Sequence, residues 1–229
     1  MEDWMAPSQV AAVFAEEIKI AGGNVADVFE DKELLFARSV LPEFMEAAPN
    51  DRLQPGVAVR ASDSDIVVHP YIFRLVCSNG AIMARALHSR RLVRDGWFLD
   101  DLSESDLETT LRVAIRQCCH REAFAAPIAR MRSASDVAAD MAITFSAYMT
   151  SHRRAISRTT MREVLLRYGQ SEDRSMYGLL NAVTSLARDT RDPETKWRLQ
   201  ELGGEIAYWP PRRPKTPRTA MARSLAGAA

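Results

Sequence analysis

Two short clusters in the sequence carry residue types that bind metals. Cys118, Cys119 and His120 are consecutive, and thiolates and imidazoles are preferred zinc ligands. Neighbouring positions on a helix point about 100° apart, so these three side chains are poorly placed to share one ion. Asp63 and Asp65 could hold the divalent ion of a nuclease, although Asp is also common in turns, where it bonds to the backbone. We expect buried thiols and turn aspartates here, and no metal site.

Nucleophilic chemistry has a candidate in Cys77, which could act with a histidine as base. No spacing selects one of the four histidines, and a cysteine at the end of an apolar strand is usually part of the core. The chain also lacks the glycine-rich phosphate loop, the dinucleotide fingerprint, the nucleophile elbow and the His-Glu-x-x-His motif. We therefore expect no catalytic residues and no cofactor, and a binding protein in preference to an enzyme.

Basic residues gather at three places along the chain. They are Arg85, His88, Arg90, Arg91 and Arg94; then His152, Arg153, Arg154, Arg158 and Arg162; then Arg212, Arg213, Lys215, Arg218 and Arg223. Trp97 and Phe98 follow the first cluster and offer aromatic faces on which a base could stack. One such cluster alone is typical of a solvated surface. Three together indicate a path for phosphates and predict nucleic acid as the partner.

The charge distribution along the chain agrees with an anionic partner. The 229 residues carry 30 basic and 30 acidic side chains. Residues 1–50 hold three basic and ten acidic side chains, whereas residues 112–168 hold ten and four. This asymmetry favours either an anionic partner at the basic end or self-association through the acidic end. The basic residues are mostly arginine, the better group for bidentate phosphate recognition, although a GC-rich genome gives the same bias.

The composition excludes several classes of protein. With 47% hydrophobic and 26% charged residues, the chain is not disordered throughout. No apolar run approaches the ~18 residues of a membrane helix, and the acidic N-terminus lacks the features of a signal peptide. Three cysteines do not make a disulfide framework. We expect a cytoplasmic protein.

The first half of the chain is predicted to form one helix followed by several β-strands. Val10, Val13, Phe14 and Ile18 recur at helical spacing, and Ser8 is the expected cap of this helix, which ends near Gly22. Strands are expected at 33–41, 56–61 and 66–76, and Pro70 in the last must sit at an edge or a bend. Asn79 and Gly80 tolerate positive φ and predict a two-residue hairpin loop.

The second half is predicted to be helical. Capping residues open helices at Ser105, Ser135, Ser157 and Ser175, and Pro193 fits the first turn of another, which Gly203 and Gly204 interrupt. The helix from Ser135 is expected to run through Met149, the helix from Ser157 to about Tyr168, and the helix from Ser175 through Leu186. We therefore predict the α+β class: an N-terminal helix and an antiparallel β-sheet with hairpins, then a helical C-terminal half. Residues 1–209 form one domain, β-rich over 24–100 and helical over 102–209, and the Pro/Arg-rich residues 210–229 form an extended basic tail.

One polar stripe lies on the helix expected after Ser175. Tyr177, Asn181, Thr184 and Arg188 are spaced four, three and four apart and therefore share one face beside the apolar face. The stripe is either a binding surface or a set of polar side chains packed against a neighbouring turn.

Several segments together resemble a known family. They are Asp31-Lys-Glu-Leu-Leu-Phe-Ala-Arg-Ser-Val-Leu-Pro42, Gln54-Pro-Gly-Val-Ala-Val59, Phe73-Arg-Leu-Val-Cys-Ser-Asn-Gly80, Leu180-Asn-Ala-Val-Thr184 and Leu199-Gln-Glu-Leu-Gly-Gly204. In this order they resemble the phage/plasmid-like proteins of the domain-of-unknown-function 932 family. The residues that carry the resemblance most specifically are Arg74, Cys77, Asn79, Gly80, Asn181 and Thr184. The resemblance implies a mobile-element origin, and its layout is similar in outline to ring-forming single-strand annealing proteins of phages.

These observations predict a phage or plasmid protein that binds nucleic acid, with single-stranded DNA as the expected polymer and a role in recombination or replication. The expected binding residues are Arg85, Arg90, Arg91, Arg94, Trp97, Arg153, Arg154, Arg158, Arg212, Arg213, Lys215 and Arg218. A homo-oligomer is expected from the charge asymmetry. The alternatives are a module that binds a host or phage protein, countering host defence or regulating a replication complex, and a metal-dependent nuclease that uses Asp63 and Asp65.

Overall fold

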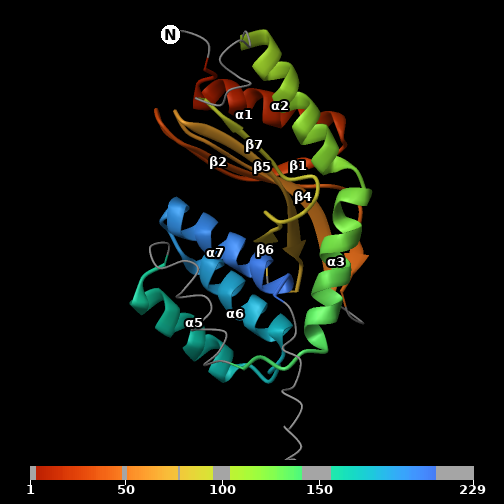
Figure 1. The fold of residues 1–229 in the computed structure, drawn as a ribbon, viewed down its shortest axis with the longest axis vertical. Helices are drawn as coiled ribbons and strands as arrows, with labels where there is room; N and C mark the ends of the chain where they lie inside the picture. The colour runs from red at the N-terminus through yellow and green to blue at the C-terminus, as the bar shows by residue number, and fades with distance from the viewer. Residues whose placement is uncertain (1–3, 48–50, 77, 95–103, 141–155, 210–229) are drawn as a thin grey trace, which may run out of the picture.

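The structure, a computed structural model, describes residues 4–47, 51–76, 78–94, 104–140 and 156–209 and has the predicted α+β class (Figure 1). The helices are α1 (Pro7–Ile20), α2 (Glu104–Cys119), α3 (Glu122–Ser135), α5 (Arg158–Gln170), α6 (Met176–Asp189) and α7 (Pro193–Ala207). The strands are β1 (Asn24–Glu30), β2 (Leu35–Val40), β3 (Met45–Glu46), β4 (Arg52–Ala61), β5 (Asp65–Arg74), β6 (Asn79–Ile82) and β7 (Arg90–Val93). The predicted tail, 210–229, lies outside the described residues.

The strands form one antiparallel sheet. Its main path runs β1-β2-β4-β5-β6, while β3 pairs with β4 and β7 pairs with β5. On the side away from β4, β5 pairs with β7 over Asp65–Val68 and with β6 over Tyr71–Arg74. Pro70 falls between these two ladders, and its carbonyl accepts a bond of 2.8 Å from the Met83 amide. A proline is tolerated in mid-strand here because its missing N–H faces the gap where the partner strand changes.

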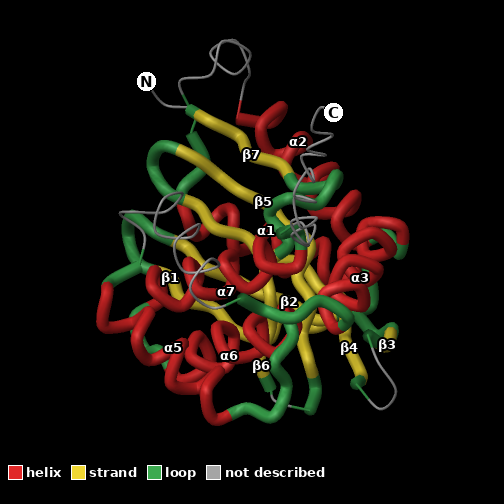
Figure 2. Tube along the Cα trace, turned by 60° about the horizontal axis from the view of Figure 1, so that its bottom comes forward, coloured by secondary structure: helices red, strands yellow, loops and turns green. Residues whose placement is uncertain are grey.

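Helices cover both faces of the sheet. Helices α1 and α2 lie on one face, α7 and α6 lie on the other, and α5 packs beneath α6 on the side away from the sheet (Figure 1). Alternation along β2 sends Leu35 and Ala37 into the core under α1 and α2, whereas Phe36 packs with Trp197 of α7. Strand β7 lies beside β5 at one end of the sheet (Figure 2).

Three of the predicted helix starts are confirmed. Ser157 caps α5 by accepting a bond from the Thr160 amide, and Ser175 caps α6 by accepting one from the Gly178 amide. Pro193 is the first residue of α7, where its missing N–H costs nothing. These starts are local signals, readable without knowledge of the fold.

Three other predicted starts are wrong. Ala6, and not Ser8, caps α1, because Pro7 takes the first helical position and the Gln9 side chain accepts a bond of 2.7 Å from the Ala6 amide. Ser135 ends α3, because the buried positions Met131 and Ala134 continue the helical period to that point. Glu104 is already helical, so Ser105 lies within α2. The remainder of the helix predicted after Ser135, up to Met149, lies mostly outside the described residues.

The predicted hairpin exists, but its loop was misplaced. Asn79 and Gly80 are the first residues of β6 and pair with Arg74 and Phe73. The turn precedes them, and Ser78 adopts a positive φ of 50°. Burial prevails over turn propensity here, because Asn79 is buried and any Cβ at position 80 would lie 2.1 Å from the Tyr71 hydroxyl oxygen.

The predicted interruption of the last helix is also wrong. Helix α7 continues through Gly203 and Gly204 to Ala207. A Cβ at Gly204 would lie 1.9 Å from the Ile82 carbonyl oxygen, and one at Gly203 would lie 2.4 Å from Cγ2 of Thr184. The two glycines therefore allow α7 to approach β6 and α6 closely.

Other elements differ in extent or were not expected. The strand predicted at 33–41 is β2, and that at 56–61 is the second half of the ten-residue β4. Strand β1 was missed because it lies at the edge of the sheet with most of its residues exposed, so burial does not impose an alternation of apolar residues. Helix α3 was missed because Pro127 lies inside it.

Candidate functional site

Five strands each contribute one side chain to a single row across the sheet. The register pairs Phe29 with Phe36, Phe36 with Arg60, Arg60 with Val67, and Val67 with Arg91. Directly paired residues lie on the same face, here the face that carries α7. We call these five residues the arginine–aromatic row. At about 4.8 Å per strand its four steps span ~19 Å.

Both ends of the arginine–aromatic row reach the surface. Phe29 on the edge strand is 40% exposed, and the Arg91 side chain at the other end is 65% exposed. Between them Phe36 is buried, with its ring centroid 6.2 Å from that of Phe29 and 5.7 Å from that of Trp197. The row therefore presents an aromatic face at one end and guanidinium donors at the other.

A buried carboxylate holds the two arginines of the row. Asp65 is 3% exposed and accepts bonds of 2.9 and 2.8 Å from Arg60 Nη2 and one of 2.9 Å from Arg91 Nε. Two cations thus share one anion, which leaves one unit of positive charge at this place. Arg94 lies over the adjacent turn, with its amide bonded to the Ser64 carbonyl oxygen at 3.0 Å. Asp65 is one of the two metal ligands that the nuclease hypothesis requires, and here its carboxylate is bound by two arginines instead.

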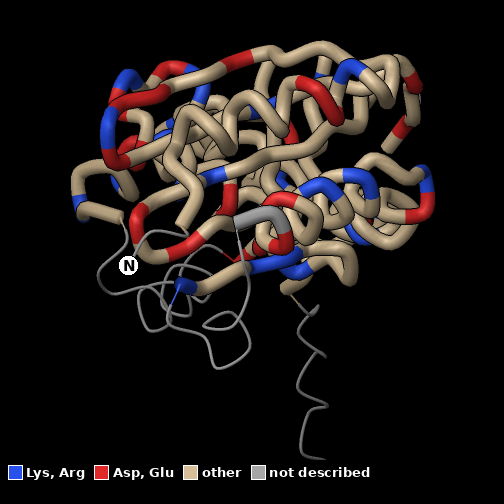
Figure 3. The backbone as a smooth tube through the Cα atoms, turned by 90° about the horizontal axis from the view of Figure 1, so that it is seen from above, with Lys and Arg blue, Asp and Glu red and all other residues tan. Residues whose placement is uncertain are grey.

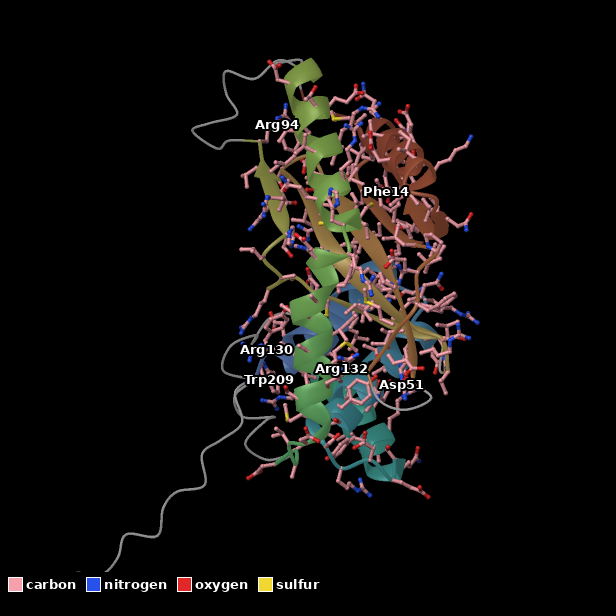
Figure 4. All side chains as sticks on the ribbon, turned by 90° about the vertical axis from the view of Figure 1, so that its right-hand side faces the viewer. Phe14, Asp51, Arg94, Arg130, Arg132 and Trp209 are labelled. Atoms are coloured by element: carbon pink, nitrogen blue, oxygen red, sulfur yellow. The ribbon has the colours of Figure 1, made fainter. Side chains whose placement is uncertain are left out.

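The predicted basic cluster around β7 is divided between two faces. Because successive side chains of a strand point in opposite directions, Arg90 and Arg91 face opposite sides. Arg90 donates to the carbonyl oxygens of Leu87 and Ser89 at 2.8 and 2.9 Å. Arg85 is exposed in the segment before β7. Arg94 lies at the end of the molecule where α2 begins (Figure 4). Of these arginines, alternation therefore places Arg91 on the α7 side.

The other predicted binding residues are not joined to this cluster. Arg158 begins α5, which is separated from the sheet by α6 and α7 (Figure 1). Trp97, Arg153, Arg154, Arg212, Arg213, Lys215 and Arg218 lie outside the described residues. In the view of Figure 3, basic and acidic positions are interspersed along the described backbone. The positive charge described here is therefore local.

Residues that carry the family resemblance meet in space. Asn79 on β6 donates a bond of 2.9 Å from Nδ2 to Oγ1 of Thr184 on α6, and both residues are buried. Gly80 lies against the Tyr71 ring. Two segments about a hundred residues apart thus form one junction between the β5–β6 hairpin and α6. Cys77, between Arg74 and Asn79 in sequence, lies outside the described residues.

The same junction continues to the end of β5. Asp51 is buried and accepts a bond of 2.5 Å from Arg74 Nε and a second bond from the Tyr177 hydroxyl. The Arg74 guanidinium also lies 5.5 Å from the centre of the Tyr177 ring. We call Asp51, Arg74, Tyr177, Asn79 and Thr184 the polar seam. Of the two hypotheses for the stripe on α6, packing against a neighbouring turn is the one that the positions of Tyr177 and Thr184 support.

A second polar group, which the sequence did not reveal, lies between α7 and the sheet. Arg38 donates to Gln200 Oε1 at 2.7 Å and also to Asp27, which accepts a further bond of 2.6 Å from Lys196 Nζ. Burial alone would raise the pKa of Asp27, but Lys196 and Arg38 hold that pKa below its usual value. The sequence signal was a single charged residue, Arg38, inside a strand that is otherwise uncharged.

Burial shifts the pKa of three neighbouring groups between this face and α7. Burial, helped by the charge of Arg60, lowers the pKa of His69 to about 4. Its Nε2 lies 3.9 Å from Oε1 of Glu201, whose pKa burial raises. Burial also raises the pKa of Tyr71 to about 12. At neutral pH this region therefore contains a neutral imidazole and a neutral phenol.

The cysteine candidates do not form a nucleophile or metal centre in the described residues. Cys118 is buried and its thiol donates to the His88 carbonyl oxygen at 3.2 Å. Burial raises the pKa of both Cys118 and Cys119 to about 12, so neither is a thiolate at neutral pH. Within the ranges that the structure describes, no group of three or more His, Cys, Asp or Glu side chains could hold a metal ion.

No protein-family model, curated protein or solved structure matches this chain. The resemblance to the phage and plasmid family therefore stays a prediction. None of the helices within the described ranges combines the length and apolar character needed to cross a bilayer.

Proposed function

We propose that this chain is a nucleic-acid-binding protein of a phage or plasmid, which binds single-stranded DNA at the two exposed ends of the arginine–aromatic row. The observation that carries the proposal is the alignment of an exposed aromatic ring and two arginines on one sheet face. Arginines neutralise phosphates, and an exposed ring stacks on any unpaired base. A duplex hides the faces of its bases, so single strands are the expected ligand.

The net positive charge that Arg60 and Arg91 leave around Asp65 supports phosphate binding. The Arg91 guanidinium uses only some of its N–H donors on Asp65 and remains largely exposed, so its other donors can reach a phosphate. Arg60 holds Asp65 through two bonds, which fixes the carboxylate without help from Arg91. Binding to phosphate therefore needs no new buried charge.

The test is fluorescence anisotropy of a labelled single-stranded oligonucleotide, with a duplex of the same sequence as control, over a range of salt concentrations. We expect binding that favours the single strand and weakens as salt rises. Absence of binding at low salt, or equal binding of the duplex, would overturn the proposal and favour a protein partner.

A matched pair of phenylalanines separates stacking from charge. Phe29→Ala removes the exposed ring of the row and is expected to weaken binding by about 1–3 kcal/mol. Phe44 is 49% exposed but lies under the Arg52 guanidinium, 4.5 Å from its ring centre, away from the row. Phe44→Ala is therefore expected to bind as the wild type does, and equal losses in the two variants would rule out stacking at Phe29.

A further inference from the structure

A pocket of about 170 Å³ opens between the edge of the sheet and the first half of α7. Its lining comes from β1, β2 and the start of α7: Asp27, Val28, Phe29, Phe36, Arg38, Arg191, Pro193, Lys196, Trp197 and Gln200. A cavity of about 150 Å³ accepts a benzene-sized ring, so this pocket has room for one flat ring.

The pocket carries an excess of positive charge. Arg38, Lys196 and Arg191 contribute three cations, and Asp27 contributes the one carboxylate of the lining. The excess is therefore two units at neutral pH. A phosphate monoester carries about −1.5 to −2 charges at this pH, which matches the excess.

Two of the three cations, Arg38 and Lys196, are held in place without a ligand. Gln200 and Asp27 each accept one bond from the Arg38 guanidinium, whose planar group has five donors. Lys196 gives one bond to Asp27 and has three donors. Arg191 is exposed just before the beginning of α7. Donors fixed before binding lose little conformational freedom when an anion arrives.

Aromatic rings form the other part of the lining. Phe29, Phe36 and Trp197 follow one another with centroid separations of 6.2 and 5.7 Å. Phe29 is the exposed member of the three and lies beside the charged groups in the lining. Such rings favour a flat heteroaromatic partner over a plain anion.

We propose that this pocket binds a nucleoside phosphate, with the base against Phe29 and the phosphate on Lys196, Arg38 and Arg191. The ligand is either a free nucleotide or the phosphorylated end of a strand. The proposal goes beyond strand binding, because a free nucleotide can occupy the pocket even if no strand binds the arginine–aromatic row.

The test is calorimetric titration of the full chain with deoxyadenosine monophosphate, deoxyadenosine and inorganic phosphate at low salt. We expect the nucleotide to bind more tightly than either part. Lys196→Gln should weaken nucleotide binding by about tenfold or more, because a charged hydrogen-bond donor is lost. Lys19→Gln, at an exposed position of α1, is the matched control and should bind as the wild type does.

Binding of the nucleotide that is unchanged in Lys196→Gln, or binding no tighter than that of inorganic phosphate, would overturn the proposal, as would no binding at all. Arg191→Gln provides a second, exposed variant, so that misfolding of one variant does not decide the result. Competition distinguishes the two sources. A 5′-phosphorylated oligonucleotide that displaces the nucleotide, where its 5′-hydroxyl form does not, assigns the pocket to strand ends. Failure of both to compete assigns it to free nucleotides.

The Arg91→Gln variant distinguishes the test of the pocket from the test of strand binding, because Arg91 belongs to the row and does not line the pocket. A chain in which Arg91→Gln loses strand binding and Lys196→Gln loses nucleotide binding has two separable sites, which share Phe29. If the wild type binds the nucleotide but no strand, the proposal for the pocket stands and the proposed function is contradicted. If it binds a strand but no nucleotide, only the proposal for the pocket is contradicted.

Discussion

Asn79 donates its side-chain amide to the hydroxyl of Thr184 across 105 positions of sequence, at 2.9 Å and in a buried environment. This bond joins β6 to α6 and lies beside Gly203, where the backbone of α7 also comes close. Strand β6 and helices α6 and α7 thus meet at Thr184. Asn79 and Thr184, which contribute to the family resemblance, therefore also have a structural role in packing.

Removing that hydroxyl tests its contribution to stability. Thr184→Val keeps the shape and leaves the Asn79 amide without its acceptor, so we expect the free energy of unfolding to fall by about 1–3 kcal/mol. Urea denaturation followed by circular dichroism measures the change. Thr159→Val, at an exposed position of α5, should stay within about 0.5 kcal/mol of the wild type. Equal effects of the two substitutions would show that the bond contributes nothing.

Two helical glycines are predicted to respond in opposite directions to alanine. Gly204→Ala places a methyl group 1.9 Å from the Ile82 carbonyl oxygen and should cost about 2 kcal/mol or more, because α7 must move away from β6. Gly169→Ala meets no atom within 4 Å and should stabilise α5 by up to about 1 kcal/mol. Thermal denaturation of both variants checks this. A stable Gly204→Ala protein would mean that α7 does not approach β6 as described.

Acid is predicted to destabilise the fold through His69. Its pKa is about 4 in the folded chain, against 6.5 for the free imidazole, so between these values the unfolded chain binds a proton that the folded chain does not. Stability from this group is complete above pH 6.5 and is lost as the pH falls towards 4. At about 1.4 kcal/mol per pKa unit the loss approaches ~3 kcal/mol.

His69→Gln should reduce this loss, measured as the free energy of unfolding from pH 7 to 4. His120→Gln, at an exposed position, serves as the control and should follow the wild-type curve. Parallel curves for the wild type and His69→Gln would show that His69 titrates alike in the folded and unfolded chain.

Local signals in the sequence predicted the class of fold and several helix starts. Ser157, Ser175 and Pro193 act through residues within one turn, so their roles are readable without the fold. Asn79 and Gly80 were misread because their strand conformation depends on Thr184 and Tyr71, which are distant or on another strand. Turn propensity is weak beside such burial.

The candidate site was less predictable than the fold. The arginine–aromatic row requires the register of four strand pairs, and one residue of slip would send Arg60 or Arg91 to the other face. The sequence singled out Arg91 and Arg94 through their neighbours in the chain. It offered no reason to join them to Phe29, Phe36 or Arg60. The pocket at α7 likewise depends on Lys196 and Arg38 coming together from distant segments.

The most direct measurement is the salt dependence of single-strand binding by Arg91→Gln beside that of Arg121→Gln. Arg121, near the start of α3, has a side chain 78% exposed and lies outside the row. We predict that the slope of log affinity against log salt becomes shallower by about 0.7 in Arg91→Gln, one phosphate contact for a single strand, and is unchanged in Arg121→Gln. Equal slopes for the wild type and both variants would contradict nucleic-acid binding at the arginine–aromatic row.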